Sequence, residues 1–116
     1  PSLTDQVRCN DDLSVCEVDR AFAENTSVLQ DAARIMNSVK DGVTRGPKLY
    51  GIRPDTPFKA LGFKNGDLVL EIAGTRIDTM VAVDFAPHFQ RFLAAGGGTI
   101  RVERKGEFLE RRFVIK

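Results

Sequence analysis

The sequence predicts an α+β fold, because a helical pattern in its first third gives way to strand patterns in the rest. Residues 18–36 carry apolar side chains near helical spacing, whereas residues 46–116 contain short apolar runs separated by turn residues. A chain of 116 residues is long enough for one compact domain with its own core. The 42% apolar and 28% charged fractions are typical of a globular protein.

The distribution of charge divides the chain in two. Residues 1–45 hold eight acidic and five basic side chains, a net charge of −3, and residues 46–116 hold eight acidic and twelve basic ones, a net charge of +4. The turn-rich stretch from Asp41 to Pro47 lies at the same place. We therefore expect an N-terminal extension over residues 1–45 and the main domain over residues 46–116.

The overall charge and hydropathy exclude some classes of partner. A net charge of +1 argues against general binding to nucleic acid or to a membrane surface. No apolar run approaches the roughly 18 to 20 residues that span a bilayer, and the first thirty residues lack the order of a secretory signal. We expect the chain as given to be soluble.

Cys9 and Cys16 flank a cluster of turn-forming residues, Asn10 to Asp12. The stretches beside them alternate polar and apolar residues, so a short hairpin closed by a disulfide is expected, and such a bond would indicate an oxidising compartment. Two reduced thiols on neighbouring strands are the alternative. A metal site would need more ligands, and the C-x-x-C spacing of redox sites is absent.

A helix is expected next, from Val18 or Asp19 to Met36. Two shorter helices, with a restart capped near Thr26 or Ser27, fit equally well. The apolar side of this element is expected to pack against the main domain.

The main domain is expected to contain strands and two helical segments. Its predicted elements are a strand over Lys48–Arg53, a proline turn, a short helix over Phe58–Gly62, strands over Leu68–Ile72 and Thr75–Ile77, a helix over Thr79–Ala95, and two strands over Thr99–Lys105 and Leu109–Ile115 around a Gly106-Glu107 turn. Pro87 would cost about 3 kcal/mol inside an uninterrupted helix. We therefore expect a kink near residues 84–86, with Asp84 capping a restarted helix.

Catalytic motifs are lacking. All four serines lie in residues 1–45, none of them in a G-x-S-x-G turn, and the only histidine, His88, has no H-E-x-x-H partner. Phosphate-binding glycine patterns are also absent, so we expect no enzyme, no cofactor and no metal. The basic and acidic side chains of residues 101–116 alternate as paired charges on the exposed face of a hairpin would.

The run from Tyr50 to Gly74 resembles a bacterial, circularly permuted PDZ domain. Its stretch Leu61-Gly62-Phe63-Lys64-Asn65-Gly66-Asp67 resembles the PDZ domain of protein C of the type II secretion system. Upstream, the segments at residues 16–20, 33–35 and 40–42 look like the sequence that precedes the domain in that family, so the resemblance covers roughly residues 16–116. Ala73, where the family often has Asn, and the stretch 80–87 depart from its pattern.

The resemblance implies a PDZ-like, partly open β-barrel or sandwich capped by two helices. PDZ domains add an extended peptide beside an edge strand and hold its carboxylate in a loop. Carried over, the edge strand is Leu49, Tyr50, Gly51 and Ile52, the loop is Arg45, Gly46, Pro47 and Lys48, and the helix face is Val81, Phe85 and His88. Pro47 would remove one loop amide, and Arg45 and Lys48 would offset that loss. Core packing for Val81 and Phe85, and solvated charge for Arg45, Lys48 and His88, are the alternatives.

The function implied by the resemblance is a non-enzymatic periplasmic interaction module of the secretion machinery. Its expected partners are the outer-membrane secretin, secreted substrate proteins and other components of the machinery, and the full-length protein would be anchored in the inner membrane through a preceding segment. One alternative is a regulatory or substrate-sensing PDZ module of an envelope protease. Another is a structural spacer whose peptide groove is filled by the N-terminal extension.

Overall fold

Eight strands form one mixed sheet in the computed structural model, which describes residues 5–12, 14–24, 33–53, 56–77, 80 and 84–116. The spatial order is β1-β2-β8-β7-β5-β4-β3, and β6 pairs with β5. The strands are β1 (Val7–Cys9), β2 (Val15–Val18), β3 (Arg34–Lys40), β4 (Val43–Tyr50), β5 (Leu68–Ile72), β6 (Thr75–Arg76), β7 (Gly97–Arg104) and β8 (Glu107–Ile115). The helices of the described residues are α1 (Arg20–Glu24), α2 (Pro57–Ala60) and α3 (Phe85–Ala94).

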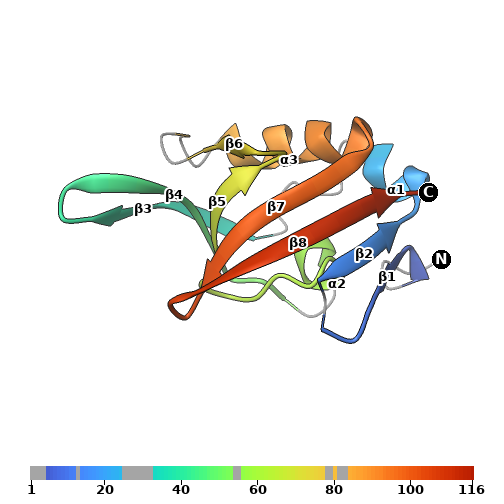
Figure 1. Cartoon of the computed structure of the whole chain (residues 1–116), viewed down its shortest axis with the longest axis horizontal. Coiled ribbons are helices and arrows are strands. Elements are labelled where there is room, and N and C mark those ends of the chain that lie inside the picture. The colour runs from blue at the N-terminus through green and yellow to red at the C-terminus, as the bar shows by residue number, and fades with distance from the viewer. Residues whose placement is uncertain (1–4, 13, 25–32, 54–55, 78–79, 81–83) are drawn as a thin grey trace.

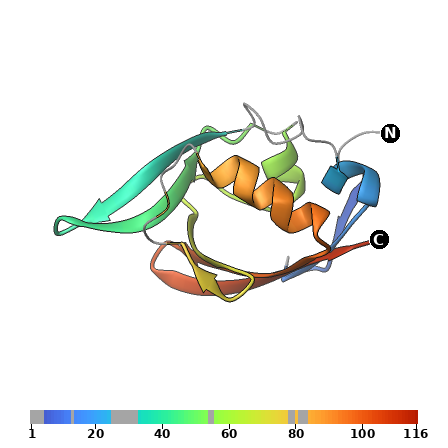
Figure 2. The same cartoon turned by 90° about the horizontal axis from the view of Figure 1, so that it is seen from above.

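The sheet is covered by helices on one side and extends into an arm at one end. Figure 2 shows the three helices on the same side of β7 and β8. Figure 1 shows the β3–β4 hairpin as an arm that projects beyond the helices along the long axis of the molecule, which measures 44 Å. The three helices therefore do not cover the part of β3 and β4 that forms the arm.

The core between helices and sheet is rich in phenylalanine. Phe89 of α3 lies at its centre, and its ring is within 6.1 Å, centroid to centroid, of five other phenylalanine rings, those of Phe58, Phe63, Phe85, Phe92 and Phe113. These rings come from α2, α3, β8 and the loop after α2. The cluster therefore fixes α2 and α3 against the sheet.

Three tight turns set the register of the hairpins. Both central residues have positive φ in Asp41-Gly42, Ala73-Gly74 and Lys105-Gly106. This is the geometry of type I′ turns, whose twist matches that of paired strands. The last turn precedes the predicted Gly106-Glu107 position by one residue, so β8 begins at Glu107.

The predicted helix to Met36 is wrong over its last part. Within the described residues, helix α1 spans Arg20–Glu24, and Arg34 to Lys40 form β3, which pairs with β4 around the Asp41-Gly42 turn. The expected restart near Thr26 lies outside the described residues. The local hairpin turn outweighs the helical spacing of a few apolar residues, because it lets a whole strand pair with β4.

The expected break before Pro87 is present. Helix α3 begins at Phe85, so Pro87 lies in its first turn, where a missing backbone N–H costs nothing. Asp84 occupies the N-cap position, although its side chain donates or accepts no capping hydrogen bond. The rest of the predicted segment before Asp84, apart from Met80, lies outside the described residues.

The N-terminal hairpin joins the main sheet directly. β1 pairs with β2, and β2 pairs in parallel with β8 from Val15↔Arg112 to Val18↔Ile115. Cys9 and Cys16, opposite each other on β1 and β2, form the expected disulfide. The division of the chain at residues 45 and 46 stays a prediction, and the β3–β4 hairpin spans it.

Removal of the disulfide should destabilise the fold by about 2.5 kcal/mol, the loop-closure entropy of a loop of roughly eight residues. The double variant Cys9→Ala/Cys16→Ala tests this by urea unfolding, compared with the oxidised wild type. The wild type treated with a dithiol should lose stability similarly, whereas the variant should not respond to the dithiol. Equal unfolding midpoints of oxidised and reduced wild type would contradict the expected contribution.

Candidate functional site

Among the strands of the described residues, β3 lies at one end of the sheet order and forms the outer edge of the arm. β4 is an interior strand: it pairs with β3 from Arg34↔Tyr50 to Lys40↔Val43, and with β5 at Lys48↔Leu68. On the β5 side, Leu49 also donates to the carbonyl of Asp67 at 2.9 Å. The expectation that residues 49–52 form the edge strand is therefore wrong, because Leu49 and Tyr50 pair with β3, and Gly51 and Ile52 lie beyond the end of β4.

The segment expected to be a carboxylate-binding loop is also part of β4. Gly46 and Pro47 are buried there, opposite Ser38 and Asn37 of β3. Pro47 is compatible with a paired strand only where its missing N–H is not needed in the ladder. The interpretation of residues 45–48 as a loop is wrong, and the weakened carboxylate capture inferred from Pro47 loses its basis.

Arg45, at the start of that segment, pairs with a carboxylate on β7. Its Nη2 donates to Oε1 of Glu103 at 2.7 Å. This hydrogen bond raises the pKa of Arg45 and lowers the pKa of Glu103. The pair therefore ties the arm to β7.

Lys48 and Tyr50 lie on the face of the arm that also carries Arg34 and Met36. The Lys48 Nζ lies 5.8 Å from the centre of the Tyr50 ring, a cation–π contact. A surface pocket on this face is lined by Arg34, Met36, Asn37, Ser38, Val39, Lys48 and Tyr50. Leu49 points the other way into the core, and Gly51 and Ile52 follow the strand, with the Ile52 amide donating to Oδ1 of Asn65.

The outcome differs among the three helix residues that were predicted to border the peptide. Phe85 is fully buried and stacks on Phe58 and Phe89, so core packing accounts for it. His88 is half-buried in a pocket between β6 and α3. Val81 lies outside the described residues. A peptide contact by His88 or Val81 stays a prediction.

The strand that sequence reasoning missed, β3, has the properties of a docking edge. Ile35 and Ala33 are half-buried against the core, as are Met80 and Ala86, the second residue of α3. Met36 and Val39 are exposed by 57% and 59%. The Asp41-Gly42 dipeptide, flanked by residues of high strand propensity, is the signal that predicts this hairpin.

The described residues contain neither a metal site nor a membrane-spanning helix. No group of three or more His, Cys, Asp or Glu side chains there is placed to hold a metal ion. Among the same residues, no helix has the length and apolar character needed to cross a membrane. The disulfide indicates an oxidising compartment, such as the periplasm.

Comparison with solved structures defines the fold. The PDZ domain of EpsC from Vibrio cholerae superposes with a TM-score of 0.56 at 18% identity, covering 81% of this chain and 88% of that one. The HtrA3 PDZ domain, solved bound to a phage-derived ligand of sequence FGRWV, superposes with a TM-score of 0.50 at 16% identity, covering 72% and 80%. No family model matches the chain, and no curated protein matches it.

The chain therefore has a PDZ-like fold, built from a mixed sheet and covering helices. PDZ domains bind peptides and proteins and are not catalytic by themselves. Within this class, EpsC and HtrA3 represent two kinds of protein to which the chain is similar.

Proposed function

We propose that this chain is a protein-interaction module that binds an extended peptide as an additional strand along β3. The observation that carries the proposal is the position of β3 at the end of the sheet order, with seven residues in strand conformation. An edge strand presents unpaired backbone donors and acceptors to a partner. The half-buried Ile35 and the exposed Met36 offer apolar contacts on the two faces of such an added strand.

The charges of the edge favour a ligand with a carboxylate. Arg34 and Lys40 lie at the two ends of β3, and Lys48 lies opposite Met36 on β4. No acidic side chain occurs in β3 or β4. A peptide with acidic groups or a free carboxyl terminus therefore meets attractive electrostatics along the strand.

We further propose that the module belongs to protein C of a type II secretion system and contacts its secretin or its secreted substrates in the periplasm. The sequence resemblance of residues 16–116 supports this assignment, together with the likeness to EpsC and the disulfide. The likeness to HtrA3 favours the second candidate, a regulatory PDZ module of an envelope protease. A preceding membrane anchor and small β domain would favour the first, and a protease domain the second.

Peptide binding is testable with the FGRWV ligand as a probe, because its apolar last residue and its free carboxylate match the apolar side chains of β3 and the cations of β3 and β4. Fluorescence anisotropy should show binding of labelled FGRWV, and weaker binding of the same peptide with an amidated terminus. Ile35→Lys should weaken binding about tenfold or more, which corresponds to about 1.4 kcal/mol. Val15→Lys, on β2 far along the sheet order, is the control and should leave binding unchanged.

Two results would count against the proposal. Equal weakening by Ile35→Lys and Val15→Lys, with both variants folded by circular dichroism, would remove β3 from the site. No binding of FGRWV, of other free-carboxyl peptides or of the periplasmic part of a secretin would oppose a peptide-binding role altogether. Binding of the secretin part alone would support the secretion assignment over the protease one.

A further inference from the structure

The Cys9–Cys16 disulfide joins a half-buried residue to a fully buried one. Cys16 of β2 is fully buried, whereas Cys9 of β1 is only partly buried against the core. Cys9 also lines a surface pocket beside α2, and the residues that complete the lining are Val7, Lys59, Ala60, Gly62, Phe63 and Lys64. A reagent from solvent therefore reaches this disulfide from the Cys9 side.

A buried arginine lies against Cys16. Nη2 of Arg111 on β8 donates to Cys16 Sγ at 3.2 Å and to the carbonyl oxygen of Leu61 at 2.5 Å. The guanidinium also lies 5.2 Å from the ring centre of Phe63 and 5.0 Å from that of Phe113. These contacts hold the cation against the sulfur that solvent does not reach.

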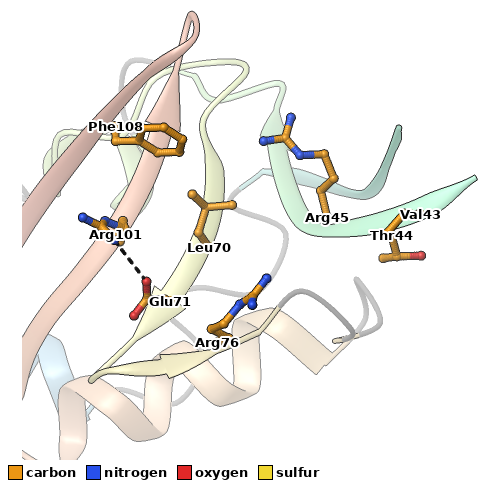
Figure 3. Close-up of a pocket in the computed structure, with 8 residues that line it drawn as sticks. All are labelled: Val43, Thr44, Arg45, Leu70, Glu71, Arg76, Arg101 and Phe108. Atoms are coloured by element: carbon orange, nitrogen blue, oxygen red, sulfur yellow. Dashed lines mark hydrogen bonds and ion pairs between the residues drawn. The ribbon is translucent and has the colours of Figure 1, made fainter. Parts of the chain in front are cut away.

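The environment of Arg111 differs from that of arginines at the surface. Figure 3 shows Arg101 beside Glu71, an ion pair in which the Arg101 side chain is 53% exposed and water screens both charges. Arg111 is buried, and burial lowers its pKa to about 10. Asp67 opposes this lowering, but its two oxygens already accept hydrogen bonds from Arg104. An anion that forms beside Arg111 therefore meets an attraction that water screens little.

Thiol–disulfide exchange creates such an anion at one of the two sulfurs. A thiolate attacks one sulfur, the S–S bond breaks, and its electron pair stays on the other sulfur, which leaves as a thiolate. A cation beside the leaving sulfur speeds its departure and favours the reduced state. Burial alone disfavours a thiolate at Cys16, but Arg111 is already buried there, so two desolvated charges form a pair.

We propose that the disulfide is a thiol-exchange site, at which a protein dithiol attacks Cys9 and Cys16 leaves as a thiolate beside Arg111. The first step forms a mixed disulfide between the attacking sulfur and Cys9. The partner's second thiolate then displaces Cys9, so that two electrons pass to this chain and the partner leaves as a disulfide. Of the partner's two thiol protons, one goes to Cys9 and the other to solvent.

The proposed exchange does not depend on peptide binding at β3. β1 and β3 lie at opposite ends of the sheet order. Reduction removes the covalent link between β1, which has three residues, and β2. Exchange would therefore loosen the N-terminal end of the sheet and leave the arm in place.

The position of attack is tested on the oxidised wild type with glutathione as the probe thiol. After a short exposure, acid stops the reaction, and mass spectrometry of the digested chain locates the mixed disulfide. About tenfold more glutathione should be found on Cys9 than on Cys16, and the preference should disappear in concentrated urea. Equal amounts on both cysteines of the folded chain, or no reaction without urea, would overturn the proposal.

The effect of the cation is tested by the reduction potential of the disulfide in dithiothreitol buffers. Arg111→Met should make reduction about tenfold less favourable, which lowers the potential by about 30 mV, and Arg111→Lys should recover part of the loss. Arg112→Met is the matched control, because it removes the same charge from the next position of β8, which is exposed. It should keep the wild-type potential. A folded Arg111→Met variant with that potential would contradict the role of the cation.

A measurement on the reduced wild type decides the same question if Arg111→Met does not fold. The ultraviolet absorbance of the thiolate should persist in the folded chain to a pH about one unit lower than in urea, which is a tenfold stabilisation of the anion. Loss of the absorbance at the same pH in both states, or at a higher pH in the folded chain, would remove Arg111 from the exchange.

Discussion

Phe89→Ala should lower the free energy of unfolding by about 3–5 kcal/mol, a large part of the stability of a domain of this size. The side chain is fully buried, and its ring contacts phenylalanines from α2, the loop after it, α3 and β8. Its removal therefore leaves a cavity shared by several elements, which cannot all close around it. Urea unfolding followed by circular dichroism measures the change.

Phe108→Ala is the matched control for that experiment. The Phe108 side chain is 63% exposed, so its loss should change the free energy of unfolding by less than about 0.5 kcal/mol. A Phe89→Ala variant as stable as Phe108→Ala would contradict the central position of Phe89 in the core.

Arg104→Met should also destabilise the protein by about 3–5 kcal/mol, because it leaves a buried carboxylate without its cation. Asp67 is fully buried, and its two carboxylate oxygens accept hydrogen bonds from Nε and Nη2 of Arg104, both at 2.8 Å. The hydrogen bond to Asp67 raises the pKa of Arg104, so the cation persists at every working pH. Thermal unfolding of the variant at neutral pH measures the loss.

Arg101→Met provides the comparison, because it removes the same charge from the same strand. Its partner Glu71 lies 3.5 Å away, and the Arg101 side chain is 53% exposed, so a loss below about 1 kcal/mol is expected. Similar losses in the two variants would show that burial of Asp67 does not decide the strength of the pair.

Much of the fold follows from local sequence signals. Pro87 required a break before α3, and the cluster between Cys9 and Cys16 predicted a hairpin that the disulfide closes. The Lys64-Asn65-Gly66-Asp67 turn is closed locally, because the Asp67 carboxylate accepts the amide of Lys64 at 2.9 Å. These features depend on residues close in the chain, so sequence alone is sufficient to find them.

Strand order and burial of charge depend on distant residues, and there the predictions fail. Residues 49–52 were expected to form an edge strand, but β3, of which only the first three residues were expected to be helical, pairs with Leu49 and Tyr50. Arg111 was expected on an exposed face, yet it is 2% exposed, donates to the carbonyl of Leu61 and lies over the rings of Phe63 and Phe113. Burial lowers the pKa of Arg111 to about 10.

Gly62 shows why that burial could not be predicted. A side chain at this position would meet the Arg111 guanidinium, since a Cβ there would lie 2.7 Å from Nη2. The sequence marks Gly62 as the end of a short helix, a role that its positive φ of 85° confirms. The second role, making room for the Arg111 guanidinium from a distant part of the chain, is visible only in the packed structure.

The most direct test of strand addition at β3 is an NMR titration of the ¹⁵N-labelled chain with unlabelled FGRWV and with the periplasmic part of a secretin. We predict shifts of the Arg34 to Lys40 amides and of α3 near His88, together with slower hydrogen exchange of those β3 amides that do not bond to β4. Shifts confined to β1 and β2, or the absence of shifts with every peptide and protein probe, would contradict strand addition at β3.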